Sequence, residues 1–185
     1  MKIVLDPAGS GRNKGREKGG RGAKEKNLTV CLAVREGLVR CGVDAVMTRE
    51  TDENKPLEER RSMCVDADFV LSVDHVPRCG ILWAASEDPP ARLVKDKALA
   101  ACLEYVDVKR GYPENRRGDF AINKGPEHSA LLQLPTGGQA GPEAIVKGIC
   151  AAMGVDYLQP EPKRKKSDEK EKQATEKIGG QDDAI

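Results

Sequence analysis

Aromatic side chains are scarce in this chain. Phe, Trp and Tyr make up 3% of its 185 residues, whereas hydrophobic residues in total make up 38%, so we expect a core of Val, Leu, Ala and Ile. Histidine is also rare, since His75 and His128 are the only two imidazoles in the sequence. The length suits one ordinary domain followed by a tail.

Paired cysteines and an excess of one charge are missing as well. The cysteines stand singly, without a CxxC pair, at Cys31, Cys41, Cys64, Cys79, Cys102 and Cys150. This scatter excludes the dense disulfide framework of small secreted domains and predicts reduced, mostly buried thiols, none of which binds metal. A net charge of +1 supplies no overall field for nucleic acid or a membrane, so we expect neither as a partner.

Long hydrophobic segments are the third absence. No apolar run approaches the length that spans a membrane, and no signal peptide precedes the first expected strand, which begins at Lys2. We therefore expect a soluble protein that is cytoplasmic in the producing cell.

Short apolar runs alternate with helical patterns in the first half of the sequence. Strands are expected over residues 2–5, 43–47 and 69–73, with helices over residues 27–40 and 57–65 between them. Asn27 is a candidate N-cap of the first helix, and Gly42 follows its end. The order β-α-β-α-β predicts a mostly parallel sheet with helices packed on it.

The same alternation continues in the second half. Further strands are expected over residues 80–85, 119–122 and 130–134, and further helices over residues 91–106 and 142–153. The predicted fold class is therefore α/β, a three-layer domain of about six mostly parallel strands flanked by helices, over residues 1–157. Residues 158–185 are rich in Lys, Glu and Asp with few large apolar residues, which predicts a disordered charged tail.

The strand over residues 69–73 is the expected centre of the sheet and ends at two groups that can hold a proton or a metal. Ligands gather at the carboxyl ends of strands in open α/β sheets, so Asp74 and His75 lie where a site is expected. Successive side chains of a strand point to opposite faces, so Asp74 shares a face with Ser72 and His75 leaves on the other unless the strand bends. One of the pair, and not both, is expected to face the site.

Two basic stretches have alternative interpretations. Residues 12–26 alternate Gly with Lys and Arg, which suits a phosphate cradle, although the spacing is not that of a P-loop. Residues 163–166 are four cations followed by acidic residues that partly neutralise them. The simpler interpretation of both stretches is a solvated segment.

Four motifs in order resemble those of the zinc-dependent N-acetylmuramoyl-L-alanine amidases, the peptidoglycan hydrolases of bacterial cell-wall enzymes and phage endolysins. The family's Asp-Pro-Gly-His-Gly-Gly corresponds to Asp-Pro-Ala-Gly-Ser-Gly at residues 6–11, and its Glu-Lys-x-Leu to residues 25–28. Its Thr-Arg-x-x-Asp and Leu-x-x-Arg correspond to residues 48–52 and 57–60. Its Ala-Asp-x-Phe/Val-Val-Ser-Ile-His-x-Asn corresponds to residues 67–76. The resemblance implies an amidase-like fold for all of the chain except its tail.

The departures from the family pattern fall on its chemistry. The resemblance implies that two histidines and a glutamate hold zinc, and that a glutamate on a late strand acts on the bound water. The metal glutamate corresponds to Glu25, but the first histidine falls on Gly9 and the second on Asp74, with His75 one place later. The late strand carries Gln133 and no glutamate. Since a zinc hydrolase needs about three protein ligands and a proton acceptor, we expect a degenerate site whose metal-ligand remnants are Glu25, Asp74 and His75.

Each remnant also has an ordinary structural interpretation. Glu25 suits the start of a helix, where a negative charge is stabilised, and Asp74 suits a turn at a strand end. His75 and His128 are compatible with plain surface positions.

Three functions follow from these residues. The first is a catalytically inactive amidase-like domain without a cofactor, which binds peptidoglycan or protein partners in a larger assembly such as a virion. The second is an active amidase that cleaves the bond between N-acetylmuramic acid and L-alanine, with zinc held by Glu25, by Asp74 or His75, and by a further ligand such as His128. The third is polyanion binding by the basic Gly-rich loop, which requires its cations to converge on one face.

Overall fold

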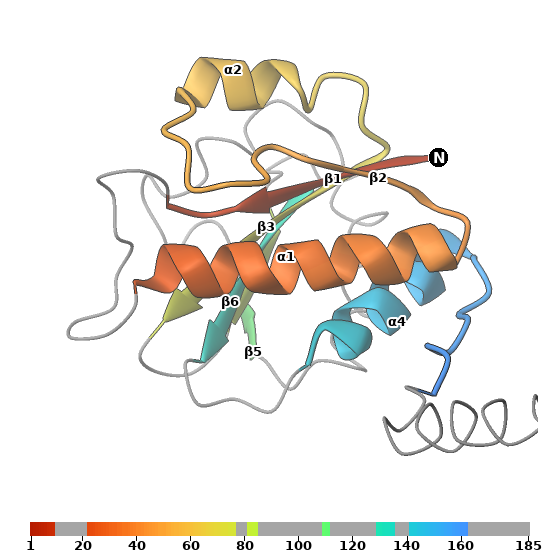
Figure 1. The fold of residues 1–185 in the computed structure, drawn as a ribbon. Helices are drawn as coiled ribbons and strands as arrows, with labels where there is room; N and C mark the ends of the chain where they lie inside the picture. The colour runs from red at the N-terminus through yellow and green to blue at the C-terminus, as the bar shows by residue number, and fades with distance from the viewer. Residues whose placement is uncertain (10–21, 77–80, 85–108, 112–128, 136–140, 163–185) are drawn as a thin grey trace, which may run out of the picture.

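The described part of the chain forms one six-stranded sheet with helices on both faces (Figure 1). This computed structural model describes residues 1–9, 22–76, 81–84, 109–111, 129–135 and 141–162. The strands are β1 (Lys2–Pro7), β2 (Asp44–Met47), β3 (Phe69–Val76), β4 (Ile81–Ala84), β5 (Lys109–Gly111) and β6 (Ser129–Pro135). The helices are α1 (Ala23–Arg40), α2 (Leu57–Ser62) and α4 (Pro142–Met153). The α/β class predicted from the sequence is confirmed.

The strand order places the expected central strand inside the sheet. The order is β2-β1-β3-β6-β4-β5, and every neighbouring pair is parallel except β4 with β6. All eight residues of β3 are buried, as expected for a strand that has neighbours on both sides and helices on both faces. The prediction of a mostly parallel sheet around the strand that starts at Phe69 is therefore confirmed.

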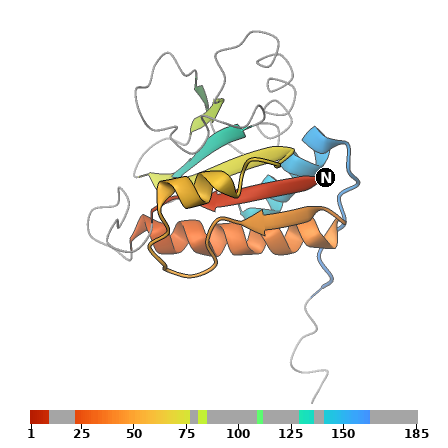
Figure 2. The same ribbon diagram turned by 90° about the horizontal axis from the view of Figure 1, so that it is seen from above.

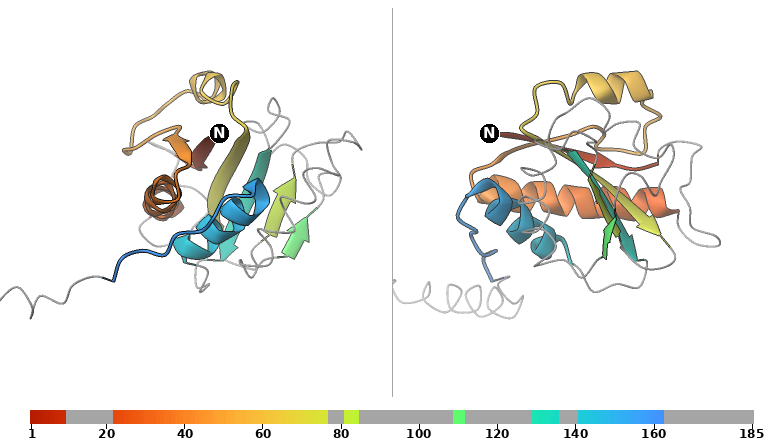
Figure 3. Two further views of the ribbon diagram at one scale, coloured as in Figure 1. Left: turned by 90° about the vertical axis from the view of Figure 1, so that its right-hand side faces the viewer. Right: turned by 180° about the vertical axis from the view of Figure 1, so that it is seen from behind.

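The helices make the outer two of three layers. Figure 3 shows α1 and α4 together on one face of the sheet and α2 on the other. The larger core lies under α1 and α4, and its members include Ile3, Leu5, Leu71, Val34, Leu38, Ile145 and Ile149. A smaller cluster of Val4, Val70 and Cys64 lies on the other face, beneath α2, which Figure 2 shows in front of β1 and β3.

Several element boundaries differ from the prediction. Helix α1 begins at Ala23, four residues before Asn27, so Asn27 is an interior residue and not the N-cap. The true N-cap, Gly22, has no capping side chain, and this is why the sequence gives no start signal there. The helix ends at Arg40 as predicted, before Gly42 with its φ of 77°. None of the helices in the described part of the chain is both long and apolar enough to cross a membrane.

Some predictions lie outside the described residues. These are residues 12–21 of the Gly-rich stretch, the helix over residues 91–106, the strand over residues 119–122, His128, Cys79, Cys102 and the tail beyond residue 162. The end of the Gly-rich stretch, residues 23–26, is not a loop and forms the first turn of α1. Within the described residues, β5 was not expected, since three residues with the sequence Lys-Arg-Gly carry no strand periodicity.

Candidate functional site

The carboxyl ends of β1, β3 and β6 lie side by side at one end of the sheet. Pro7 at the end of β1 pairs with Val73, and Asp74 pairs with Gln133 on β6. Asp74, His75 and Gln133 are buried, with 9%, 8% and 3% of their surfaces exposed. Open α/β sheets bind their ligands at this end, where the carboxyl ends of parallel strands lie together. We call it the candidate site.

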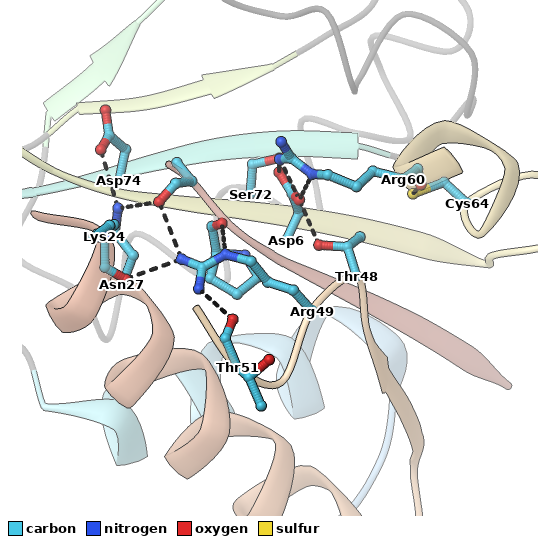
Figure 4. Close-up of polar contacts among 12 residues, drawn as sticks. Asp6, Lys24, Asn27, Thr48, Arg49, Thr51, Arg60, Cys64, Ser72 and Asp74 are labelled. Atoms are coloured by element: carbon cyan, nitrogen blue, oxygen red, sulfur yellow. Dashed lines mark hydrogen bonds and ion pairs between the residues drawn. The ribbon is translucent and has the colours of Figure 1, made fainter. Parts of the chain in front are cut away.

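The amide of Asn27 is the centre of the candidate site (Figure 4). Its Nδ2 atom donates to the Ala8 carbonyl oxygen at 2.9 Å and to Asp74 Oδ1 at 3.2 Å. Its Oδ1 atom accepts from the His75 backbone N–H at 2.8 Å and lies 2.6 Å from His75 Nδ1. The amide thus uses both of its donors and both of its acceptor positions, as a fully buried side chain should.

One side chain reaches both Asp74 and His75 because β1 ends beside them. Alternation along β3 predicts that these two residues leave on opposite faces, so that a site could contact only one. The last β1 residue, Pro7, pairs with Val73, and no β1 residue pairs with Asp74. The Asn27 amide occupies this position at the strand end and contacts both residues. The expectation that only one of the pair can take part is therefore wrong for a group placed there.

The carboxylate of Asp6, on β1 one residue before Pro7, is buried next to the candidate site. Asp6 is 1% exposed and accepts two hydrogen bonds from Arg60 Nη2, at 2.5 Å to Oδ1 and 2.7 Å to Oδ2. Thr48 Oγ1 donates to Oδ1 at 2.6 Å, and Ser72 Oγ donates to Oδ2 at 3.0 Å. The bidentate ion pair is therefore accompanied by hydroxyl donors that satisfy the remaining acceptor positions. This network joins β1, β3, α2 and Thr48, the residue after β2, next to the candidate site.

The guanidinium of Arg49 donates hydrogen bonds to the backbone of the segments around the candidate site. Arg49 is 1% exposed and its Nε donates to the Pro7 carbonyl oxygen at 3.1 Å. Its Nη2 donates to the carbonyl oxygens of Ala8 and Lys24 at 3.4 and 3.0 Å, and Nη1 to that of Thr51 at 3.1 Å. Burial lowers the pKa of Arg49, against the opposing effect of Asp52 and Asp6. Arg49 thereby ties the end of β1, the start of α1 and the turn after β2 to one another.

Glu25 lies on a different side of α1 from Asn27. Two residues along an α-helix correspond to a rotation of about 200°, and the side chain of Glu25 is exposed. Its neighbour Lys24 forms an ion pair with Asp52. The first turn of α1 does lie at the same edge of the sheet as Gly9 and Asp74, since Arg49 joins Lys24 to Ala8.

The described residues do not fit a zinc site. No group of three or more His, Cys, Asp or Glu that can hold a metal ion occurs among them, so Glu25 does not combine with Asp74 and His75 into such a group. Gly9 has a φ of 73°, a conformation that side chains rarely adopt, at the place of the family's first histidine. The His75 Nδ1 atom faces a carbonyl oxygen, which leaves Nε2 as its ligand atom.

Asn27 and Arg49 are members of the candidate site that were not predicted from the sequence. A signal for Asn27 was present, because Asn27, Cys31, Val34 and Leu38 recur at the spacing of one helix face and all four are buried. An asparagine on an apolar stripe must find hydrogen-bond partners inside the protein. Arg49 gave no comparable signal, since its partners are backbone carbonyls.

Comparison with known proteins identifies the fold. No protein-family model matches the chain, and no curated protein sequence matches it either. Solved structures of N-acetylmuramoyl-L-alanine amidases do match. The catalytic domain of CwlV from Bacillus (Paenibacillus) polymyxa var. colistinus is 15% identical with a TM-score of 0.64, and the match covers 82% of this chain and 95% of that one.

Two further amidases give similar values. AmiC2 of Nostoc punctiforme is 21% identical with a TM-score of 0.64, over 83% of this chain and 97% of that one. The CwlD amidase of Clostridioides difficile, in complex with the GerS lipoprotein, is 16% identical with a TM-score of 0.62, over 84% and 99%. This chain therefore has the amidase fold over most of its length.

Proposed function

We propose that this chain is an amidase-like domain that does not hydrolyse peptidoglycan and acts instead as a wall-binding or structural component of a larger assembly. The amidase fold supports a domain of this kind. The proposal of inactivity rests on the candidate site, where the side chains that should bind metal and move protons are replaced or engaged in other contacts.

The contacts of Asn27 carry the proposal. Its amide binds Asp74, His75 and Ala8 at once, so these three residues are engaged in contacts within the fold. A hydrolytic site needs polar atoms directed at substrate, metal or water. The atoms of Asp74 and His75 that contact Asn27 stabilise the fold and are not directed at any of these.

The missing proton acceptor supports the proposal further. Gln133 lies next to Asp74 in the register of β3 and β6, on the late strand where the family resemblance places its glutamate. A neutral amide cannot accept the proton of an attacking water. General-base catalysis commonly contributes at least ~10²-fold in rate, so its loss removes most of the hydrolytic chemistry. No cofactor is therefore proposed.

The second candidate function is an active amidase with a non-standard metal site. One observation favours it: a metal-binding histidine commonly donates its other ring N–H to an oxygen, as His75 Nδ1 does to Asn27. An active site of this kind needs Glu25 and a ligand such as His128 in addition to His75 Nε2. Glu25 is exposed, and it does not form a metal-binding group with His75 among the described residues. Polyanion binding by the basic loop has no support from the described residues.

The partners proposed are peptidoglycan or other proteins, and a virion is one assembly that would hold such a domain. The CwlD amidase was solved in complex with a lipoprotein. An amidase fold with a protein partner is thus a known arrangement, and this chain needs no catalysis to take part in one.

The purified 185-residue protein tests the proposal directly. We expect sedimentation with isolated cell walls, no release of stem peptides, and a zinc content far below one per chain. Peptide release that a chelator stops would instead establish the second candidate function. Absence of both sedimentation and release would favour a structural role with protein partners over wall binding.

Restoring the family pattern provides a matched variant. Gly9→His, Asp74→His and Gln133→Glu together should raise the zinc content above that of the original chain, because they place two imidazoles and a carboxylate at the carboxyl ends of β1, β3 and β6. The left-handed backbone at Gly9 makes the histidine cost about 1–2 kcal/mol of stability. Zinc binding that is equal in the original chain and the triple variant would contradict the proposed degeneracy.

A further inference from the structure

The chain after α4 turns back and runs beside this helix toward its first turn. The turn is made by the glycine that follows α4, whose φ is 65°. The Val155 N–H then donates to the Cys150 carbonyl oxygen at 2.9 Å. Two residues later, the ring of Tyr157 lies against Lys147, whose Nζ is 5.1 Å from the ring centroid. We call residues 155–158 the strap.

The strap ends on the C-terminal end of α1. Leu158 uses both of its backbone groups there, since its N–H donates to Cys41 Sγ at 3.3 Å and its carbonyl oxygen accepts from Arg40 Nε at 3.0 Å. Figure 1 shows the chain passing this end of α1 after it leaves α4. The Leu158 side chain is 52% exposed, so hydrogen bonds contribute more than burial of this side chain to holding the end of the strap.

One carboxylate oxygen on the first turn of α4 keeps these contacts together. Glu143 Oε2 accepts from the Tyr157 hydroxyl at 2.7 Å and from Arg40 Nη2 at 2.7 Å. The same guanidinium donates to Leu158 through Nε, so Glu143 orients the group that binds the end of the strap. The contact of Tyr157 and the contact of Leu158 with Arg40 therefore both depend on the Glu143 carboxylate.

The ion pair at the centre of this arrangement is partly open to solvent. The side chains of Arg40 and Glu143 are 24% and 40% exposed, and ion pairs of this kind are modest in strength and weaken in salt. The pKa of Tyr157 is raised, first by burial and then by its hydrogen bond to Glu143, so its hydroxyl donates at neutral pH. The strap is thus held by a few contacts that a change of one charge can weaken.

Other titratable groups surround the strap on both helices. They are Lys147 beneath the tyrosine ring, Cys41 beside Leu158, and Cys150 in α4. None of these three changes its charge between about pH 7 and pH 3, because ammonium groups and thiols keep their protons in acid. Asp156, on the strap itself, is an exposed carboxylate. Acid therefore acts here on carboxylates, of which Glu143 binds both the strap and α1.

We propose that the strap is held on α1 by the charge of Glu143 and is released in acid. When Glu143 takes up a proton, Arg40 loses its anionic partner and the Tyr157 hydroxyl loses a charged acceptor, so charge-assisted contacts become ordinary ones. Residues 155–162 then extend from the end of α4 by up to about 3.5 Å each, or about 28 Å in total. Release would thus lengthen the connection between the domain and its tail, whether or not the domain hydrolyses peptidoglycan.

Glu143→Gln in the 185-residue protein tests the role of the charge, because glutamine keeps an acceptor oxygen and resembles the protonated acid. At pH 7 we expect protection of the Leu158 amide against hydrogen exchange to fall about tenfold, as for the loss of one charge-assisted hydrogen bond. Alkylation of Cys41 by iodoacetamide, mapped by mass spectrometry, should become faster. Protection at Ile149, which is buried in α4, should stay unchanged. Unchanged Leu158 protection and Cys41 alkylation would overturn the proposal.

Asp156→Asn is the matched control, since it removes the same charge from an exposed carboxylate of the strap. This variant should leave Leu158 protection and Cys41 alkylation as they are in the unaltered chain. An effect equal to that of Glu143→Gln would overturn the specific role of Glu143.

Lowering the pH of the unaltered chain gives a measurement that requires no variant to fold. The Leu158 protection factor, which corrects for the intrinsic pH dependence of exchange, should fall between about pH 7 and pH 3 while that of Ile149 is kept. In Glu143→Gln it should already be low at pH 7 and change little. A Leu158 protection factor that stays constant in acid, or that falls only together with that of Ile149, would overturn the proposal.

Discussion

The side chain of Asn27 accepts a hydrogen bond from β3 that a further residue of β1 would otherwise accept. Strand β1 ends at Pro7, and the Ala8 N–H still donates to the Val73 carbonyl oxygen at 2.9 Å. The next β3 donor on that side is the His75 N–H, and the Asn27 Oδ1 atom accepts it in place of a backbone carbonyl. Because such a donor cannot be left unpaired inside the protein without cost, Asn27 is required where β1 stops.

Replacing Asn27 should therefore destabilise the fold more than an ordinary polar substitution. We expect Asn27→Ala to lower the free energy of unfolding by about 2–4 kcal/mol, since it leaves the His75 N–H and the Ala8 carbonyl oxygen buried without this partner. Urea unfolding measures the change. Thr29→Ala, on the exposed side of the same helix, is the control and should change stability by less than about 0.5 kcal/mol. An equal effect of the two substitutions would show that the amide contacts contribute nothing.

The close contact of α1 with α4 is the main feature at the scale of the elements. Gly37 is buried in the last turn of the 18-residue helix α1, and a glycine within a helix costs up to about 1 kcal/mol relative to alanine. The reason for a glycine is the neighbour, because a Cβ atom would lie 2.6 Å from Val146 Cγ2. Glycine at this position lowers the helix propensity of α1 but allows α1 and α4 to pack closely.

Gly37→Ala should consequently destabilise the protein although alanine is the better helix former. We expect a loss of about 1–3 kcal/mol in thermal or urea unfolding, since the methyl group has no space. The double variant Gly37→Ala with Val146→Ala should be less destabilised than the sum of its parts, because the second change removes the clashing methyl group. Glu36→Ala on the exposed face is the control. Stabilisation by Gly37→Ala would mean that the helices separate without cost.

The elements also show where prediction from the sequence succeeds and where it stops. The interior strand β3 and the helix α4 were predictable, because β3 begins with a short, mostly apolar run and Pro142 and Gly154 mark the ends of α4. The start of α1 was not, since Gly22 gives no side-chain cap. Asp74 and His75 do lie near the end of β3, but the organisation of their contacts was not predictable. The position of Asn27 depends on where β1 ends, which is a tertiary fact that no local pattern contains.

At the scale of the whole molecule, buried thiols make the fold sensitive to alkali. Below pH 9.0, the ordinary thiol pKa, folded and unfolded chains both keep these protons, and the thiols do not affect stability. Above it the unfolded chain ionises first, because burial raises the pKa of Cys64 to about 11 and those of Cys31 and Cys150 as well. The free energy of unfolding should therefore fall as pH rises from 9.0, by about 1.4 kcal/mol per pH unit for each affected thiol. Urea unfolding between pH 8 and about 10.5 checks this, and a steeper loss in Cys64→Ala than in the unaltered chain would contradict it.

The segment after α4 belongs to the folded domain through Leu158. Tyr157 donates its hydroxyl hydrogen to Glu143 Oε2 at 2.7 Å, and Leu158 contacts Arg40 and Cys41. A chain that ends at Pro162 should unfold at the same urea concentration as the full chain. A chain that ends at Asp156 should lose about 2 kcal/mol, because both residues and their hydrogen bonds are removed. Equal stability of the two shortened chains would place the domain boundary before Tyr157.

The strand order also has a consequence for folding during synthesis. By the time residue 76 has been made, β2, β1 and β3 can pair, with α1 against them. The next strand along the chain, β4, cannot join this sheet, because its partner there is β6, which begins at Ser129. Until β6 arrives, the eight-residue strand β3 has one edge without a neighbour, and such edges pair readily with other chains. A ribosome that stalls between residues 76 and 129 would therefore carry an aggregation-prone half-sheet, and a chaperone bound to the nascent chain would protect this edge.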